Sequence, residues 1–299
     1  TLKFAHVLPA SNSYCGKIYT VNIGIDESHY KNNYAQTITK KDIKKNFNND
    51  IKLKNISDNF YSSKYHFSRE FKRIKKFTIK EYISTLKIDK SIGLILKKRN
   101  SILYAQLKSG FLSAGSFSNL FKKYTGLSPK QYQERYLNSF RVIKNFEETK
   151  ECFEIEHNSE KMKRNRGSCE VEIIFPKTYR EYIVFVGLFI RPIPNHKPIV
   201  GKALLNKRTC KLKNIPDGKY YLLSCAIKKS NNPLDYFKFD KALRGMVEES
   251  INFPSMEEKK FKIVLREAEE DDPPIVFNVS QLLVEKILKK NSNSEEKKI

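Results

Sequence analysis

Twenty residues decide the fold of this chain: SKYHFSREFKRIKKFTIKEY at positions 63–82 recurs fifty positions later as SAGSFSNLFKKYTGLSPKQY at positions 113–132. Seven of the twenty positions carry the same residue. The identical pairs are Ser63/Ser113, Phe67/Phe117, Ser68/Ser118, Phe71/Phe121, Lys72/Lys122, Lys80/Lys130 and Tyr82/Tyr132. Such a repeat predicts that one supersecondary unit occurs twice. A duplicated unit suits a target that also repeats, as duplex DNA does.

Each copy is predicted to begin with an amphipathic helix. Phe67 and Phe71 lie four residues apart, which places them on one helical face, and Phe117 and Phe121 repeat this spacing. These apolar faces are expected to be core. The opposite face of the first copy is polar, so it is free to meet a ligand.

Further helices are predicted around the two copies. Residues 53–60 and 102–109 are short amphipathic segments followed by tight turns, so each unit is expected to be helix, turn, helix. Between the units, a helix capped by Thr78 is expected to run for about 18 residues, or roughly 27 Å. This length is close to the ~34 Å between successive major-groove openings of B-DNA. A rigid spacer of that length would set two recognition helices in adjacent grooves.

The basic charge of the chain is concentrated around the repeat. The 299 residues include 57 Lys and Arg against 33 Asp and Glu, a net charge of +24. Residues 40–140 hold 23 basic and 7 acidic residues, a net +16, whereas residues 167–299 hold 24 and 18, a net +6. A local basic excess of this kind favours nucleic acid as the partner.

Residues 40–136 resemble the DNA-binding domain of AraC/XylS-type transcription regulators. The stretch 63–72 is similar to that family's first recognition helix, and GFLSAGSFSNLFKKYTGLSP at 110–129 is similar to its second-unit signature. The resemblance implies double-stranded DNA as a partner, with RNA polymerase as a further candidate. It also implies that bases are contacted from Tyr65, Ser68 and Arg69 and from Ala114, Gly115, Ser118 and Asn119. Lys64, Lys72 and Lys122 complete the predicted DNA-binding set.

The chain departs from the family's pattern at three places. Lys76 stands where the family usually has Gly, so a positive φ there would cost about 1 kcal/mol, whereas Gly126 keeps the pattern. Ala105 and Gln106 stand where the family has an apolar and a small residue, which predicts looser packing beneath the second recognition helix. The short side chains of that helix indicate that the second unit positions the protein more than it selects bases.

The C-terminal half is predicted to be rich in β-strands. The polar stretch 147–166 is expected to be a linker. After it, β-branched and aromatic runs bounded by Pro, Gly and Asn predict strands at residues 169–175, 182–191, 220–227 and 261–265. The stretch PDGKYYLLSCAI at 216–227 is similar to part of prealbumin-like or carboxypeptidase-regulatory-like β-sandwiches.

The expected fold class is therefore α + β multidomain: an all-α double helix-turn-helix domain at 40–146 and a β-sandwich-like domain at 167–290. Residues 1–39 remain unassigned, a terminal amphipathic helix is expected at 275–288, and 291–299 are expected to be disordered. The β domain follows the DNA-binding domain, although the resembled family commonly places its sensor first. A small-molecule or protein effector is expected to act on the β domain.

No catalytic or metal-binding pattern stands out in the sequence. The five Cys residues are scattered without a CxxC pair, so they are expected to be reduced thiols. His196 has no partner at catalytic spacing and is expected to be an exposed loop residue, whereas the aromatic residues at 236–239 are expected to be core. No enzymatic activity, cofactor or metal is therefore predicted. No apolar run is long enough to cross a membrane, so a cytoplasmic protein without a membrane partner is expected.

These observations predict a sequence-specific DNA-binding transcription regulator of the AraC type, with a C-terminal β domain that senses a ligand or partner. One alternative is a β-sandwich ligand- or carbohydrate-binding protein that carries a nonspecific basic nucleic-acid-binding module. Another is an enzyme that acts on nucleic acid. Selection of bound sequences from a random pool separates the first alternative from the main hypothesis, because a nonspecific module returns no motif. A divalent-cation-dependent nuclease assay tests the second.

Overall fold

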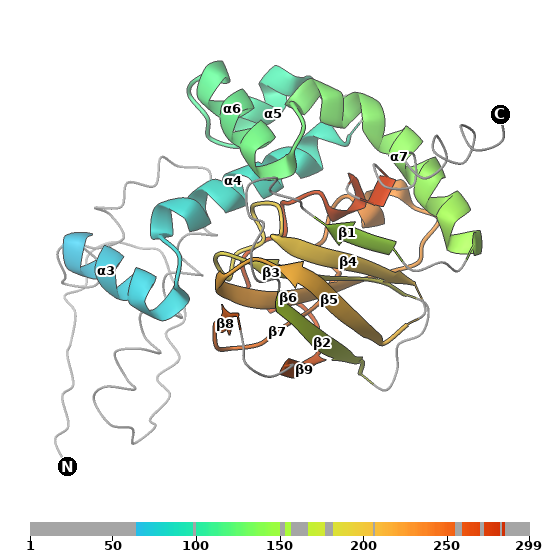
Figure 1. The fold of residues 1–299 in the computed structure, drawn as a ribbon. Coiled ribbons are helices and arrows are strands. Elements are labelled where there is room, and N and C mark those ends of the chain that lie inside the picture. The colour runs from blue at the N-terminus through green and yellow to red at the C-terminus, as the bar shows by residue number, and fades with distance from the viewer. Residues whose placement is uncertain are drawn as a thin grey trace, which may run out of the picture.

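The computed structural model describes residues 64–97, 100–149, 153–156, 167–176, 182–205, 207–254, 259–269, 272–281 and 283–284. Within these residues, helices come first and strands follow (Figure 1). The helices are α3 (Lys64–Lys75), α4 (Ile79–Ile95), α5 (Ile102–Lys108), α6 (Ala114–Thr125) and α7 (Pro129–Thr149). The strands are β1 (Phe153–Glu156), β2 (Gly167–Ile174), β3 (Tyr182–Phe189), β4 (Val200–Leu205), β5 (Thr209–Ile215), β6 (Gly218–Lys228), β7 (Leu243–Met246), β8 (Ile251–Phe253) and β9 (Lys259–Val264), and a 3-10 helix, η1 (Pro233–Tyr236), follows β6. We call residues 64–149 the helical part and residues 153–284 the β part.

The two copies of the repeat end in the same capping motif. At the start of α4, the Thr78 Oγ1 accepts a hydrogen bond from the Glu81 N–H at 3.2 Å, and the Glu81 carboxylate accepts one from the Thr78 N–H at 2.9 Å. At the start of α7, Ser128 and Gln131 exchange the equivalent bonds at 3.2 and 3.1 Å. Each pair satisfies two backbone N–H groups that lack a partner within their helix. The repeat therefore encodes where both long helices begin.

Helix α4 connects two apolar clusters. Near its beginning, Tyr82 packs with Phe71 of α3. Towards its end, Ile88 and Ile92 pack with Phe121 of α6. The helix has 17 residues, or about 25 Å at 1.5 Å per residue. The predicted connecting helix is confirmed, and each end of it holds one recognition helix.

The strands of the β part form two sheets. The larger sheet has the order β1-β4-β3-β6-β7, with β8 also paired to β6, and the smaller sheet has the order β5-β2-β9. Every residue of β3 is buried. Its alternate side chains explain this, because Val184 and Val186 pack between the sheets whereas Ile183 and Phe185 pack towards the helices. An almost continuous apolar strand is what burial on both faces requires.

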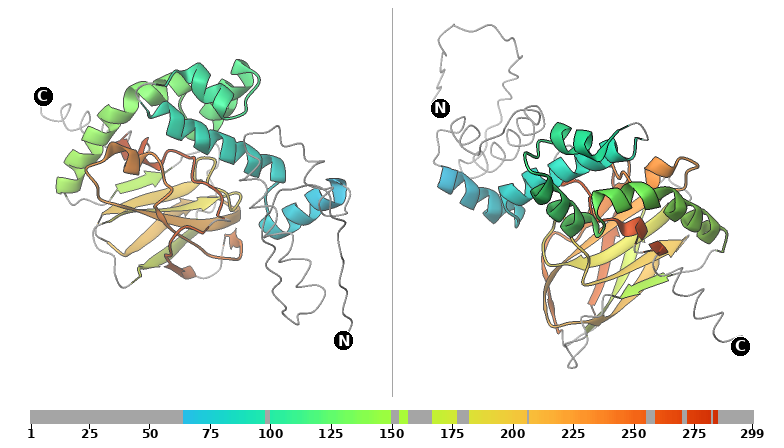
Figure 2. Two further views of the ribbon diagram at one scale, coloured as in Figure 1. Left: turned by 180° about the vertical axis from the view of Figure 1, so that it is seen from behind. Right: turned by 90° about the horizontal axis from the view of Figure 1, so that it is seen from above.

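The helical part and the β part share one core. Helices α4 to α7 lie along one side of the larger sheet, as two opposite views agree (Figures 1 and 2). The cluster that contains Phe117 and Phe121 of α6 and Tyr132 of α7 also contains Phe185 of β3 and Phe237. Because apolar side chains of both parts are buried in one cluster, removing one part would expose core residues of the other.

The predicted linker at 147–166 differs from the structure at both places where residues are described. Helix α7 continues to Thr149. Glu147 is buried, and its carboxylate accepts one hydrogen bond from the Tyr236 hydroxyl and one from Lys144 at 2.7 Å. Residues 153–156 form β1, which pairs with β4. The polar composition was misleading here, since Glu147 contacts the β part and residues 153–156 are a strand of its larger sheet. Residues 157–166 lie outside the described part.

The four predicted strands are confirmed as β2, β3, β6 and β9, each within a few residues of the expected bounds. The predicted helix at 275–288 is wrong in its first turn. Residues 275–278 are not helical, and the helix begins at Val279, where the Asn278 side chain accepts a hydrogen bond from the Gln281 N–H at 2.9 Å. The expectations for residues 1–39, 53–60 and 291–299 concern segments outside the described residues.

Candidate nucleic-acid interface

Helix α3 presents a polar face opposite a buried aromatic anchor. Phe71 is buried against Phe77 and Tyr82, with ring centroids 5.8 and 6.0 Å away. Across the helix, the Tyr65 side chain is 69% exposed and that of Arg69 is exposed too. Lys72 is exposed and Ser68 half-buried, whereas the side chain of Lys64 lies outside the described ones. The β part thus leaves the predicted reading face of α3 accessible.

Helix α6 repeats this arrangement in the second unit. Phe117 and Phe121 are buried, with ring centroids 5.6 Å apart, and Phe121 meets Tyr132 of α7 edge to face at 5.4 Å. The predicted contact residues of this helix are all exposed. They are Ala114, Gly115, Ser118, Asn119 and Lys122. Ser113 caps the beginning of the helix, because its Oγ accepts a hydrogen bond from the Ser116 N–H at 3.3 Å. The structure therefore brings the predicted residues together on two helices, one at each end of α4.

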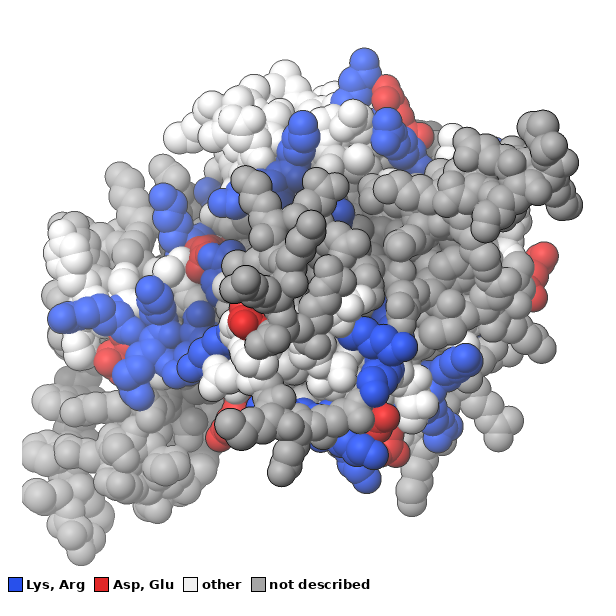
Figure 3. Space-filling model, in the orientation of Figure 1, with Lys and Arg blue, Asp and Glu red and all other residues white. Residues whose placement is uncertain are grey.

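The two predicted recognition helices, α3 and α6, differ in charge. We call them the first and the second reader. On the face shown in Figure 3, Lys and Arg side chains gather where α3 lies, and the surface over α5 and α6 is mostly uncharged. Helix α3 has Lys72, Arg73 and Lys75 in its last turn, and α6 has Lys122 and Lys123 in its last turn. The expectation that the second unit positions the protein more than it selects bases stays a prediction.

The turns after the two readers have the same backbone geometry. Lys76 has a φ of 61° and Gly126 a φ of 86°, and the N–H of each donates to the carbonyl four residues earlier at 2.9 Å. The sequence predicted strain at Lys76 if its φ is positive, and the φ is positive in the structure. A side chain in this region is strained, since its Cβ approaches the backbone carbonyl.

We therefore expect Lys76→Gly to relieve this strain and to raise the free energy of unfolding by about 1 kcal/mol. The greater chain entropy of Gly in the unfolded state offsets part of this gain. The matched variant Gly126→Ala should lower it by a similar amount, although an added Cβ there meets no atom within 4 Å. Urea unfolding followed by circular dichroism measures both changes. A Lys76→Gly protein less stable than the wild type would contradict the strain argument.

The prediction of looser packing under α6 concerns Ala105 and Gln106, and the structure shows how these two residues are placed. Ala105 and Gln106 of α5 are both buried, so this layer contains a polar amide. The Gln106 Nε2 donates to the Phe111 carbonyl at 3.3 Å, within the turn that leads to α6. Hydrogen bonding compensates part of the cost of burying the amide, and it holds the turn in place.

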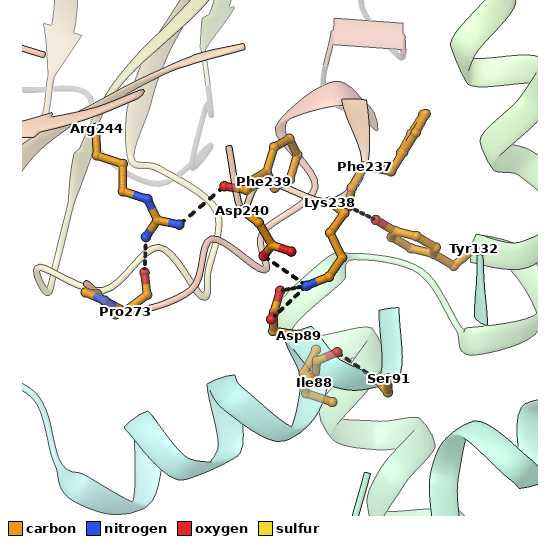
Figure 4. A network of polar contacts seen from close by, with 10 residues as sticks. All are labelled: Ile88, Asp89, Ser91, Tyr132, Phe237, Lys238, Phe239, Asp240, Arg244 and Pro273. Carbon is orange, nitrogen blue, oxygen red and sulfur yellow. Dashed lines mark hydrogen bonds and ion pairs between the residues drawn. The ribbon is translucent and has the colours of Figure 1, made fainter. Parts of the chain in front are cut away.

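Contacts between α4 and the β part were not predicted from the sequence. Arg191 forms an ion pair with Glu81, and Asn195 donates to the Thr85 hydroxyl at 3.2 Å. Further along α4, the Lys238 Nζ lies 2.9 Å from Asp89 (Figure 4). These pairs are separated by 110 or 149 positions. Spacing in the sequence gives no signal for such contacts, and we refer to them together as the α4 clamp.

His196 was expected to be an exposed loop residue, and the structure places it differently. It is half-buried, with its ring edge-on to Phe189 at 5.5 Å and its Nδ1 2.9 Å from Asn195 Oδ1. Burial lowers the pKa of His196 to about 4, and the nearby Arg191 acts in the same direction, whereas Glu81 opposes them. His196 is therefore neutral near pH 7 and adjoins the α4 clamp.

The His196 environment predicts that the fold loses stability in mild acid. Unfolded His196 takes up a proton near its usual pKa of 6.5, but the folded protein resists this until about 4. The contribution is therefore complete above pH 6.5 and is lost as the pH falls towards 4, with a loss of about 2 kcal/mol by about pH 5. Unfolding of the wild type and His196→Gln at about pH 7 and about pH 5 measures it. A stability difference between the two proteins that is the same at both pH values would contradict the prediction.

The remaining sequence expectations concern the β part. The aromatic residues Tyr236, Phe237 and Phe239 are core, as predicted. Asp272, which lies in an acidic stretch of the sequence, binds Arg266 through both carboxylate oxygens at 2.8 Å. Among the residues that the structure describes, no group of three or more His, Cys, Asp or Glu is placed to hold a metal ion. In the same residues no helix combines the length and apolar character needed to cross a bilayer.

Comparison with known proteins identifies the repeat region. A family model described as a helix-turn-helix domain matches residues 56–135. The bifunctional transcriptional activator/DNA repair enzyme AdaA of Bacillus subtilis (strain 168) is 32% identical over 92 residues, 31% of this chain and 44% of that protein. The melibiose operon regulatory protein of Escherichia coli (strain K12) is 28% identical over 92 residues, 31% of this chain and 30% of that protein. The chain thus spans less than half the length of these two relatives.

A third relative is matched over most of its length. The probable transcription factor PqrA of Proteus vulgaris is 32% identical over 87 residues, which are 29% of this chain and 71% of that protein. The helices α3 and α6, which lie at the two ends of one connecting helix and are anchored by Phe71 and by Phe117 and Phe121, agree with these matches. The chain belongs to the AraC/XylS family of transcription regulators.

Proposed function

We propose that this protein is a sequence-specific DNA-binding transcription regulator that reads a site with α3 and α6. The observation that supports this most is the duplication of the reader: in both copies a buried Phe, Phe71 or Phe121, anchors a helix whose opposite face is exposed. A solvated polar face on one helix would need no partner. Two such faces on one rigid connecting helix suit a ligand that repeats along its length.

The two readers have different roles in this proposal. The Arg69 guanidinium can donate two hydrogen bonds to a guanine edge, and Tyr65 and Ser68 can contact neighbouring bases. Lys64 and Lys72 bind phosphate. In α6, the short side chains of Ala114, Gly115, Ser118 and Asn119 let the beginning of the helix approach the backbone, where its N–H groups and Lys122 suit phosphate oxygens. Base choice therefore comes mainly from α3.

For the β part we propose the role of sensor. Its two sheets, which we take to be a β-sandwich, share a core with the helices that hold the readers. A ligand or partner protein that changes this shared interface would change how the readers are presented. RNA polymerase is a further candidate partner of the DNA-bound protein, as expected for a transcription regulator.

Selection of bound DNA from a random pool tests the proposed function. A conserved motif with two parts separated by about one helical turn is the expected result, because α4 sets the two readers roughly that far apart. Recovery of unrelated sequences that bind equally well would instead support a nonspecific basic module joined to a ligand-binding β part. The full chain is the appropriate protein, since the two parts share a core.

A further inference from the structure

A cavity of about 320 Å³ lies in the β part, on the side of the larger sheet that faces the helices. Its floor comes from strands β3, β6 and β7, and Phe185, Leu223 and Met246 line it. Its cover comes from the loop that follows β3 and from residues 272–279. Most of the lining is apolar, and the volume falls within the range of small-molecule sites.

One buried cation in the cavity wall has incomplete hydrogen bonding. The Arg244 guanidinium of β7 donates to the carbonyls of Pro273 at 2.6 Å and Phe239 at 3.3 Å (Figure 4). Its Nε is buried and has no hydrogen-bond partner among the described residues. The nearby Asp272 is already bound by Arg266. A buried guanidinium bonded only to neutral carbonyls favours an added acceptor, above all an anionic one.

The same guanidinium is connected to the helical part through three consecutive residues. The Phe237 carbonyl accepts a hydrogen bond from the Tyr132 hydroxyl of α7 at 3.3 Å. Lys238 binds Asp89 of α4, and the Phe239 carbonyl is the one that accepts from Arg244. Figure 4 shows these contacts side by side. Residues 237–239 therefore join the cavity wall to both long helices.

The cover of the cavity also belongs to the α4 clamp. Pro192, Pro194 and Pro198 line the cavity, and the same loop carries the two residues that bind Glu81 and Thr85. At its far end the loop lies directly on the sheet, because a Cβ added to Gly187 would be 2.9 Å from Pro198 Cβ. An occupant that moved this loop would move the contacts that hold the beginning of α4, next to α3.

We propose that this cavity binds a small amphipathic anion, with an apolar body about the size of an aromatic ring system and one acidic group that pairs with Arg244. The acidic group competes with the carbonyls of Phe239 and Pro273 for the guanidinium N–H groups. Binding thereby changes the position of residues 237–239 and the hold of the β part on α4. This inference rests on the proposed role of the β part as a sensor, and it gives that sensor a site and a ligand class.

The preference for an anion can be measured with three probes of one shape. We expect 1-naphthaleneacetate to bind the full-length protein at least about tenfold more tightly than 2-(1-naphthyl)ethanol, since charge-assisted hydrogen bonds are roughly twice as strong as neutral ones. The amine 2-(1-naphthyl)ethylamine should bind more weakly still. Titration calorimetry without DNA gives all three dissociation constants. Equal binding of the acid and the alcohol would overturn the proposal.

Three variants locate the site. Arg244→Met should reduce acid binding to the level of the alcohol, whereas Lys213→Met, which removes an exposed cation on β5, should leave it unchanged. Because Arg244 also holds two carbonyls, that variant could fold poorly. Met246→Trp offers an independent test. Met246 lies at an exposed edge of the cavity, so the larger Trp side chain should fill the cavity and weaken the binding of all three probes at least about tenfold. Full binding by a folded Met246→Trp protein would place the probes elsewhere and overturn the proposal.

Linkage to DNA is measured separately. Saturating 1-naphthaleneacetate should change the affinity for the selected DNA site, and DNA should change the affinity for the acid by the same factor. Arg244-dependent binding of the acid with no effect on DNA affinity would refute the coupling through residues 237–239. If no DNA motif is recovered but the acid still binds through Arg244, the regulator function fails and the ligand site stands. If a DNA motif is recovered but the acid does not bind through Arg244, the ligand site is rejected and the regulator function stands.

Discussion

Replacing Lys238 by Met is expected to lower the free energy of unfolding by about 3 kcal/mol, because it leaves a carboxylate in the shared interface without its cation. The Lys238 Nζ lies 2.9 and 3.1 Å from the two carboxylate oxygens of Asp89 and 3.0 Å from Asp240. The Asp89 side chain is only 20% exposed, so water cannot replace the ammonium fully. Burial raises the pKa of Asp89, and Lys238 opposes that shift.

Methionine isolates the charge because it keeps the apolar stem of the lysine. That stem packs on α4, where a Cβ added to Gly93 would lie 3.1 Å from Lys238 Cε. Urea unfolding of the full chain measures the loss. Lys241→Met, at an exposed position, is the matched control and should change stability by less than about 0.5 kcal/mol.

A double-variant cycle separates the lost cation from lost packing. Adding Asp89→Asn to Lys238→Met should restore most of the stability, because the neutral amide no longer requires a cation. The penalty of Lys238→Met should also shrink as the pH falls through the raised pKa of Asp89, since the protonated carboxyl is neutral. A double variant no more stable than Lys238→Met alone would show that the ion pair is not the cause.

The sequence predicted the elements whose physical determinants are local. Capping residues and the spacing of phenylalanines are short-range signals, so α3, α4 and α6 were expected at nearly the observed bounds. The apolar runs of β3 and β6 were equally clear. Strand β5, in contrast, has mostly polar and partly exposed residues, because the smaller sheet leaves one face to solvent, and it gave no strand signal.

What the sequence could not predict is how its two parts meet. The α4 clamp joins residues more than one hundred positions apart, and no local pattern ties Asp89 to Lys238 or Glu81 to Arg191. One weak signal exists: Lys238 stands between the apolar residues Phe237 and Phe239, and a Lys within such a run requires a partner. The cavity had no signal at all, since strand edges and loops from distant segments assemble it.

The β part packs against the helices that hold the readers, and this shapes the last prediction. The clamp and the shared core hold α4 and α7 on one side of the molecule, and the predicted reading faces of α3 and α6 remain exposed. Loss of a reading side chain should therefore change DNA binding without changing the fold. Arg69 is the strongest case, because it is exposed and no hydrogen bond or ion pair among the described residues engages it. The neighbouring Glu70 is occupied by Arg73 at 2.9 Å.

Arg69→Ala is expected to weaken binding to the selected site by roughly 10- to 100-fold, the effect of losing one bidentate contact to a guanine. Discrimination should disappear at one base pair and persist at the others. Lys72→Ala provides the contrast, because loss of a phosphate contact weakens all sequences alike and lowers the salt dependence by about one charge. Lys213→Ala, on the exposed side of the smaller sheet, controls for the loss of a positive charge alone.

Fluorescence anisotropy with the selected site and its single-base variants, at two salt concentrations, measures these differences. The pattern matters more than the size of the loss. A base reader changes which sequence is preferred and leaves the salt slope nearly intact, whereas a phosphate contact changes the slope and leaves the preference intact. If Arg69→Ala reduced the affinity for every DNA sequence equally and lowered the salt dependence of binding by about one charge, Arg69 would be a phosphate ligand. Base selection by α3 would then have to come from Tyr65 and Ser68.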